Sequence, residues 1–249
     1  MGYFLAFVVG VPAGALAAAR LGWQWVFACL AIGSSLVFVI ALAGLPKDPS
    51  GHRLTRSRFS AIEHFQKPDR LSGIAAAFLT SGGIVGFLTY IGAWLNSVHG
   101  VSVERIGLLF MFAGVGAIIA SPFSGWLSDH AGKRTVIVLA NVILAVLFLV
   151  VARTNWGIGL VVGVAVLSIA ASARQAPLHA LSTEIVGTEI RGEYIALRNA
   201  ASQTGIAAVA AISSVVFDSA GFEGVSLVAA AVTLMIPICC IWLKEPAAD

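Results

Sequence analysis

The segment 125–134 places small and charged residues between two long apolar runs, and it carries the most specific chemistry in the sequence. Asp129 stands where one helix is expected to end and the next to begin, so its carboxylate can accept hydrogen bonds from free helix-start amides. Gly125 and Gly132 allow a tight turn. Lys133 and Arg134 supply positive partners. From its residues alone, the segment predicts a capped turn flanked by basic side chains.

A polar stripe follows the apolar run 158–180. Steps of four, three and four residues separate its members, which places all of them on one helix face. Lipid would leave such groups without hydrogen-bond partners, so the stripe must face protein or water. A hydrogen-bonding seam between helices is one solution and a water-facing surface is the other. The stripe consists of Ser168, Ser172, Gln175 and His179.

A mostly aromatic face follows the run 71–97. Such a face suits amphiphilic or drug-like ligands if it lines a cavity. Aromatic residues at helical spacing also commonly pack between helices, so both interpretations stay open. The face consists of Thr80, Phe87, Tyr90 and Trp94.

The sequence lacks the patterns that an enzyme would need. It holds no His-Glu-x-x-His, no serine paired with a histidine and no aspartate pair inside an apolar run. The three cysteines all lie in apolar runs and predict neither a disulfide framework nor a metal site. We therefore expect a protein that is not an enzyme, with no cofactor and no metal. No acidic residue lies in the middle of an apolar run, so His179 is the titratable helix residue that could serve proton coupling.

The chain that carries these residues has the composition of a membrane protein. Of its 249 residues, 59% are hydrophobic and 11% are charged, with a mean hydropathy of +0.94, whereas soluble domains are about 25% charged. The pI near 9.0 reflects basic loops on one side of a bilayer. We expect a lipid environment and no nucleic acid partner.

Eight apolar runs have the length that a helix needs to cross about 30 Å of hydrocarbon. Because lipid offers no partner for backbone groups, each run must be helical. The six tryptophans fall at or beside run ends, as interfacial anchoring predicts. The first run lacks the positively charged start of a signal peptide. The expected cores are 1–19, 24–45, 71–97, 106–127, 135–152, 158–180, 194–217 and 225–243.

Basic residues gather in alternate loops, which predicts the orientation of the chain. One side holds Lys47, Arg53, Arg56, Arg58, Lys67, Arg70, Lys133, Arg134 and Lys244, with Arg191 and Arg198 beside them, and the other holds Arg20, Arg105 and Arg153. The first side is expected to be cytoplasmic, with both termini inside, in a plasma membrane such as the bacterial inner membrane. Arg174 is expected to snorkel to that interface, the alternative being charge recognition inside the bundle.

A polar stretch and an internal echo divide the chain. The segment 46–70 has prolines at its margins and reads as a cytoplasmic linker between two membrane units, 1–45 and 71–249. The sequence pattern of the turn at 21–26 recurs at 220–225, six helices later. A repeat of six helices would make 1–45 the last two helices of one half and 71–249 a complete second half.

The segment 125–134 closely resembles the Gly-x-x-x-Asp-basic-x-Gly-basic-basic signature of the major facilitator superfamily. The cluster Gly10, Pro12 and Gly14 looks like the fifth helix of proton-driven drug and sugar exporters, with fewer glycines and prolines than that motif has. The segment 178–205 looks like the loop that enters the eleventh helix of the family.

The resemblance implies an all-α bundle made of helices five to twelve of a twelve-helix transporter. It implies that Gly125, Asp129, Gly132, Lys133 and Arg134 form a cytoplasmic latch that makes and breaks as the halves rock. His130 stands at a position that is usually Arg or Lys, so we expect this latch to carry less charge near neutral pH. The stripe on run 158–180 would line the central cavity.

The implied function is transport of a small molecule, with proton-driven export of a drug or sugar by alternating access as the leading hypothesis. The chain would be an N-terminally truncated form, which we expect not to transport alone. The competing hypothesis is a non-transporting truncated product or an accessory membrane subunit.

Overall fold

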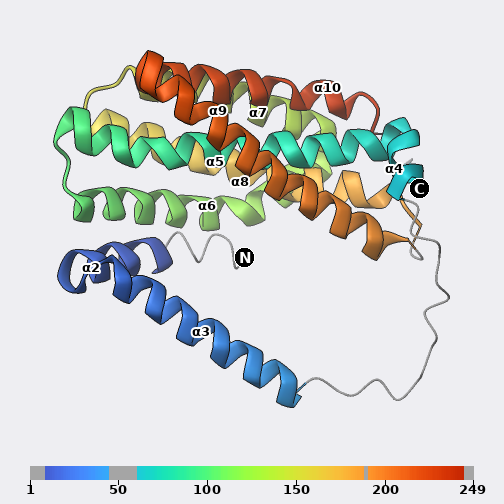
Figure 1. Ribbon diagram of the computed structural model, residues 1–249. Coiled ribbons are helices and arrows are strands. Elements are labelled where there is room, and N and C mark those ends of the chain that lie inside the picture. The colour runs from blue at the N-terminus through green and yellow to red at the C-terminus, as the bar shows by residue number, and fades with distance from the viewer. Residues whose placement is uncertain (1–8, 45–60, 188–189, 244–249) are drawn as a thin grey trace.

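The computed structural model describes residues 9–44, 61–187 and 190–243, and every regular element in these ranges is a helix (Figure 1). The helices are α2 (Val11–Leu21), α3 (Trp23–Gly44), α4 (Ala61–Gln66), α5 (Pro68–His99), α6 (Val103–Ala131), α7 (Lys133–Ala152), α8 (Ile158–Glu184), α9 (Arg191–Leu234) and α10 (Ile236–Cys240). The prediction of an all-α membrane bundle is confirmed.

Six helices among the described residues are long and apolar enough to cross a membrane. One of them, at residues 191–240, contains the predicted run 194–217 and most of the run 225–243. A straight helix of that length would reach about 75 Å, more than twice the thickness of the hydrocarbon. The chain instead leaves helical geometry at Gly221 (φ 64°, ψ −162°) and turns back on itself (Figure 1). Residues 191–220 form the first limb of α9, and residues 222–234 form the second.

The first predicted run is only partly described. Residues 1–8 lie outside the described ranges, and α2 begins at Val11 with a proline in its first turn. Figure 1 shows α2 beside α6, while α3 extends away from the body of the bundle. No residue of α3 is buried, so the main bundle consists of α5 to α10.

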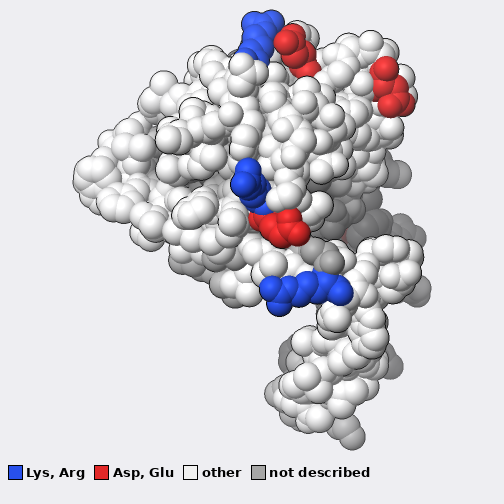
Figure 2. All heavy atoms as spheres, turned by 90° about the vertical axis from the view of Figure 1, so that its left-hand side faces the viewer, with Lys and Arg blue, Asp and Glu red and all other residues white. Residues whose placement is uncertain are grey.

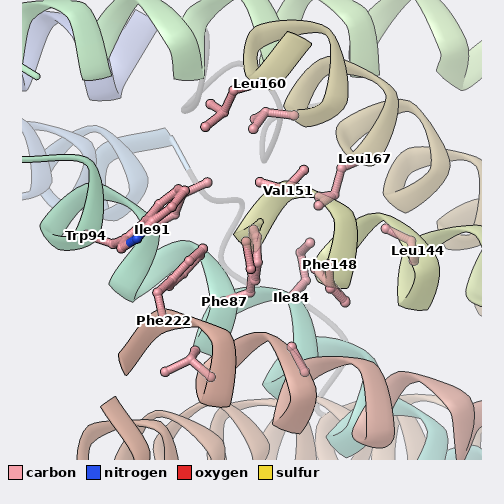
Figure 3. Packing of buried hydrophobic residues seen from close by; sticks show 14 of the residues in the cluster. Ile84, Phe87, Ile91, Trp94, Leu144, Phe148, Val151, Leu160, Leu167 and Phe222 are labelled. Carbon is pink, nitrogen blue, oxygen red and sulfur yellow. The ribbon is translucent and has the colours of Figure 1, made fainter. Parts of the chain in front are cut away.

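The hydrophobic core joins α5, α7 and the second limb of α9. Phe87 is fully buried, with its ring centroid 4.6 Å from that of Phe148 and 5.0 Å from that of Phe222 (Figure 3). The indole of Trp94 stacks on Phe222 at 4.5 Å. Two members of the aromatic face, Phe87 and Trp94, are therefore packing residues in this conformation, as the helix-packing interpretation expected.

Small residues bring α5 and the first limb of α9 to backbone contact. A Cβ atom added at Gly82 would lie 2.7 Å from the carbonyl oxygen of Gly205. A Cβ atom at Gly205 would overlap the carbonyl of Phe78 and lie 2.9 Å from its Cα. Membrane helices associate through such close packing because lipid removes the hydrophobic driving force between them.

We expect Gly205→Ala to destabilise the bundle by about 1–3 kcal/mol, because the backbone of Phe78 cannot rotate away as a side chain could. The measurement is the thermal unfolding midpoint of the purified protein in detergent. Gly192→Ala is the matched control, since it lies on the same limb and its Cβ would meet no atom within 4 Å. Equal midpoints for the two variants would contradict the close approach of α5 and α9.

Candidate functional site

The charged turn lies at the α4 end of the bundle, where α6 ends at Ala131 and α7 begins at Lys133 (Figure 1). Gly132 joins the helices with a φ of 85°, which only glycine adopts readily. Asp129 lies in the last turn of α6 and is exposed. Gly132 is the N-cap of α7 and no side chain caps that helix, so the predicted cap is wrong. The reason is that α6 continues past Asp129, which leaves the carboxylate a turn before the free amides of α7.

The two basic residues of the turn hold neighbouring helix ends. Lys133 Nζ donates to both carboxylate oxygens of Glu184 at the end of α8, at 2.8 and 2.7 Å. Arg134 Nε donates to the carbonyl oxygen of Leu243 at 3.1 Å, and its Nη2 donates to that of Ile241 at 3.2 Å. These carbonyls follow α10, where helix-end acceptors attract cations. Within the described ranges, Asp129 makes no ion pair with either basic residue, so sequence reasoning missed Glu184 as the partner.

His130 and Gly125 complete the turn. The Nδ1 atom of His130 lies 2.8 Å from the carbonyl oxygen of Trp126, and its ring lies 4.5 Å from that indole. Gly125 is half-buried in α6, and a Cβ atom there would meet nothing within 4 Å. The structure therefore places the signature residues on one turn but does not require glycine at position 125 for space.

The polar stripe divides between two environments. Ser172 is buried and donates to the carbonyl oxygen of Ala117 on α6 at 2.9 Å. In return, Ser124 on α6 donates to the carbonyl oxygen of Ala173 at 2.9 Å. That carbonyl has no helical donor four residues later, because Pro177 lacks an N–H. This part of the stripe is a seam between α6 and α8.

The rest of the stripe lies nearer the surface. Ser168 and Gln175 are half-buried, and His179 is exposed close to the α4 end of α8. His179 Nδ1 lies 3.4 Å from Nη1 of Arg198 on the first limb of α9. Arg198 is only 4% exposed, and sequence reasoning placed it merely among the interfacial basic residues.

The aromatic face also divides. Tyr90 donates to the carbonyl oxygen of Ala210 on α9 at 3.3 Å, and its ring lies 5.2 Å from that of Phe217. Thr80 is buried, and its Oγ1 has no hydrogen-bond partner. Together with the buried Phe87 and Trp94, these residues face other helices of the bundle.

The predicted snorkelling of Arg174 is wrong, because its side chain is fully buried. Its Nη1 donates to Oδ1 of Asn141 on α7 at 2.6 Å, and its Nη2 donates to the carbonyl oxygen of Thr80 on α5 at 3.3 Å. A guanidinium can reach three helices at once through its several donors. Arg174 therefore ties α5, α7 and α8 together, and sequence spacing alone did not show it.

The glycine–proline cluster lies at the start of α2. Gly10 is its N-cap, and Pro12 stands in its first turn, where a missing N–H costs no helical hydrogen bond. A Cβ atom at Gly14 would lie 3.7 Å from Val26 Cγ1 on α3, which is ordinary contact. The cluster thus begins the α2–α3 hairpin.

Comparison with known proteins identifies what this bundle is similar to. Residues 1–114 and 74–249 match the family model of the Major Facilitator Superfamily. The chain is 23% identical over 231 residues to an uncharacterised MFS-type transporter, YbcL, of Bacillus subtilis (strain 168). It is 30% identical over 156 residues to the purine ribonucleoside efflux pump NepI of Shigella sonnei (strain Ss046) and 29% identical to that of Escherichia coli (strain K12).

These matches cover different shares of the proteins compared. The match with YbcL covers 92% of this chain and 58% of the relative, and the matches with NepI cover 61% of this chain and 37% of each relative. The chain therefore spans less than two thirds of the length of the relatives it matches.

We expect Asn141→Leu to destabilise the bundle by about 3–5 kcal/mol, because it removes an acceptor from the buried charge of Arg174. The double variant Asn141→Leu with Arg174→Met should recover most of that loss, since no buried charge remains. Thermal unfolding of the purified protein measures both. If the double variant is no more stable than Asn141→Leu, the proposed stabilising link between Arg174 and Asn141 is contradicted.

Proposed function

The chain belongs to the major facilitator superfamily, and on that premise we propose that the whole protein exports a small molecule across a membrane by alternating access. The similarity to efflux pumps over 156 residues of this chain carries this proposal. Alternating access needs two halves that rock about a central site. Residues 71–249 would be one half and residues 1–45 would belong to the other, with 46–70 as the linker.

The packing supports that division. Helices α5 to α9 share one hydrophobic core, and α10 packs with α5, α7 and α8 in a second. By contrast, α2 contacts this body mainly through α6. A contact restricted to one helix pair can change without unpacking the core. We propose that the α2–α6 contact lies between the halves.

The latch proposal follows from how the turn distributes its charges. Lys133 and Arg134 are engaged within the bundle, while Asp129 is exposed and makes no ion pair with a described residue. An exposed carboxylate at the rim of the half can bind donors of the other half and release them. Asp129 would thus be the latch residue, with Gly132, Lys133 and Arg134 holding the turn in place.

For substrates, we propose small polar molecules that carry an aromatic base, such as purine ribonucleosides, beside the drug-like and sugar substrates that the sequence motifs suggest. The similarity to purine ribonucleoside efflux pumps supports the first class. Gln175 and His179 offer hydrogen-bonding groups at the accessible part of the stripe. Proton antiport is proposed from the cluster at 10–14, with His179 as a titratable group.

The orientation proposal rests on the two ends of the bundle. Six basic residues of the described ranges lie at the α4 end, namely Lys67, Arg70, Lys133, Arg134, Arg191 and Arg198. The opposite end, in Figure 2, is mostly uncharged, with basic side chains near acidic ones such as Arg153 beside Glu223 at 3.8 Å. We propose that the α4 end is cytoplasmic, in a bacterial inner membrane, with both termini on that side.

The orientation predicts opposite labelling of two exposed positions. In intact cells, a cysteine at Ser219 should react with a membrane-impermeant thiol reagent, whereas a cysteine at Gln66 should react only after permeabilisation. The native cysteines are first replaced by serine, since Cys29 is exposed. Labelling of position 66 but not position 219 in intact cells would reverse the proposed topology.

The latch proposal predicts a specific transport defect. The test uses the whole transporter. Asp129→Asn keeps the size of the side chain and removes its charge, so transport per molecule of membrane protein should fall about tenfold or more, the effect of losing about 1.4 kcal/mol. Substrate flux and the amount of protein in the membrane are measured together. Asp218→Asn is the control, because Asp218 is also exposed but lies at the opposite end. A fall in flux that only follows the protein amount would reject the latch.

A further inference from the structure

A buried arginine beside an exposed histidine forms a donor site that the latch and the packing do not use. Arg198 is 4% exposed, and its Nε is buried without a hydrogen-bond partner. Its Nη1 lies 3.4 Å from Nδ1 of His179. Within the described ranges, no carboxylate forms an ion pair with Arg198. A buried guanidinium with an unused N–H is costly unless a ligand completes its hydrogen bonds.

The contact with His179 decides which groups this site presents. A guanidinium can only donate, so Nδ1 of His179 must accept, and the hydrogen of the imidazole is then on Nε2. Because His179 is exposed, that second N–H is accessible beside Arg198. Gln175 lies one turn earlier on the same face of α8 and is half-buried. The site therefore offers several donors on two neighbouring helices.

Acidic groups and a buried tyrosine also lie at this end of the bundle. The carboxylates of Asp69 and Glu193 lie at the same end, with Glu193 3.4 Å from His64 and Asp69 close enough to interact electrostatically with Tyr194. Tyr194 itself is buried and donates to the carbonyl oxygen of Arg70 at 3.1 Å. Selectivity among planar ligands would come from the geometry of the Arg198 donors.

A guanidinium has two parallel donors, and it matches two adjacent acceptors on one edge of a planar base. The O6 and N7 atoms of a 6-oxopurine are such a pair, whereas a 6-aminopurine presents a donor at the same place. We propose that Arg198, oriented by His179, is a specificity-determining residue that binds the O6 and N7 edge of a 6-oxopurine nucleoside. This inference rests on the proposed export of purine ribonucleosides and names the residue that selects among them.

The test compares inosine and adenosine binding to the purified intact gene product by isothermal titration calorimetry. The unaltered protein should prefer inosine. Arg198→Gln should lower the ratio of inosine to adenosine affinity about tenfold or more, because glutamine pairs with the N6 and N7 atoms of a 6-aminopurine. The ratio does not depend on the fraction of folded protein. Arg191→Gln is the control, since Arg191 is exposed on the same limb, and it should leave the ratio unchanged.

Arg198→Lys is a second test variant, to be used if Arg198→Gln does not fold. Lysine keeps the charge but loses the paired donors, so the preference for inosine should also fall. If both nucleosides bind but neither Arg198 variant changes the ratio, this inference is wrong while the proposed function stands. If the unaltered protein binds neither nucleoside, the proposed substrate class and this inference fail together.

Discussion

The close approach of α5 to the first limb of α9 is the contact on which the bundle depends. Lipid tails are as apolar as leucine side chains, so helices in a bilayer gain little from apolar burial and must associate through close packing and hydrogen bonds. Gly82 and Gly205 allow this approach, and the backbone of Phe78 lies directly against the second glycine. Tyr90 and Ser202 then donate across the same interface to carbonyls of the opposite helix. The position of Arg198 beside α8 follows from where this contact holds α9.

The helical elements were predictable because the bilayer restricts what a backbone can do. Apolar run length and interfacial tryptophans identified the membrane helices, since an unpaired backbone group in lipid is too costly. The rotation of each helix was not predictable, because it depends on which neighbour it packs against. Arg174 shows the difference, since its distance along α8 suggested snorkelling and its direction buries it against Asn141 and Thr80. The end of α6 similarly depended on Gly132 and not on Asp129.

Residue spacing predicted which candidate site residues share a helix face, but it did not predict what each of them contacts. The stripe on α8 does share a face, as its period required, yet Ser172 faces α6 and His179 is exposed. One helix face can cross from a packed interface to an open end, because its neighbours diverge along its length. Glu184 and Arg198 were overlooked as partners because long-range contacts have no local pattern. Their only signal was that each lies near a helix end on the same side as Lys133 or His179.

The proposed alternating access would require halves that are rigid inside and weakly joined to each other, and the described contacts support that proposal. Within α5 to α10 the helices are joined by backbone contact, by a buried arginine that reaches three helices and by the Lys133–Glu184 pair. The α2–α3 hairpin is attached mainly through α2 and α6, and α3 buries no residue. Elements with few buried contacts change position at low cost. In the proposed transporter, a carboxylate at that boundary, which is the role proposed for Asp129, would bias the position of one half against the other without opposing the packing of either.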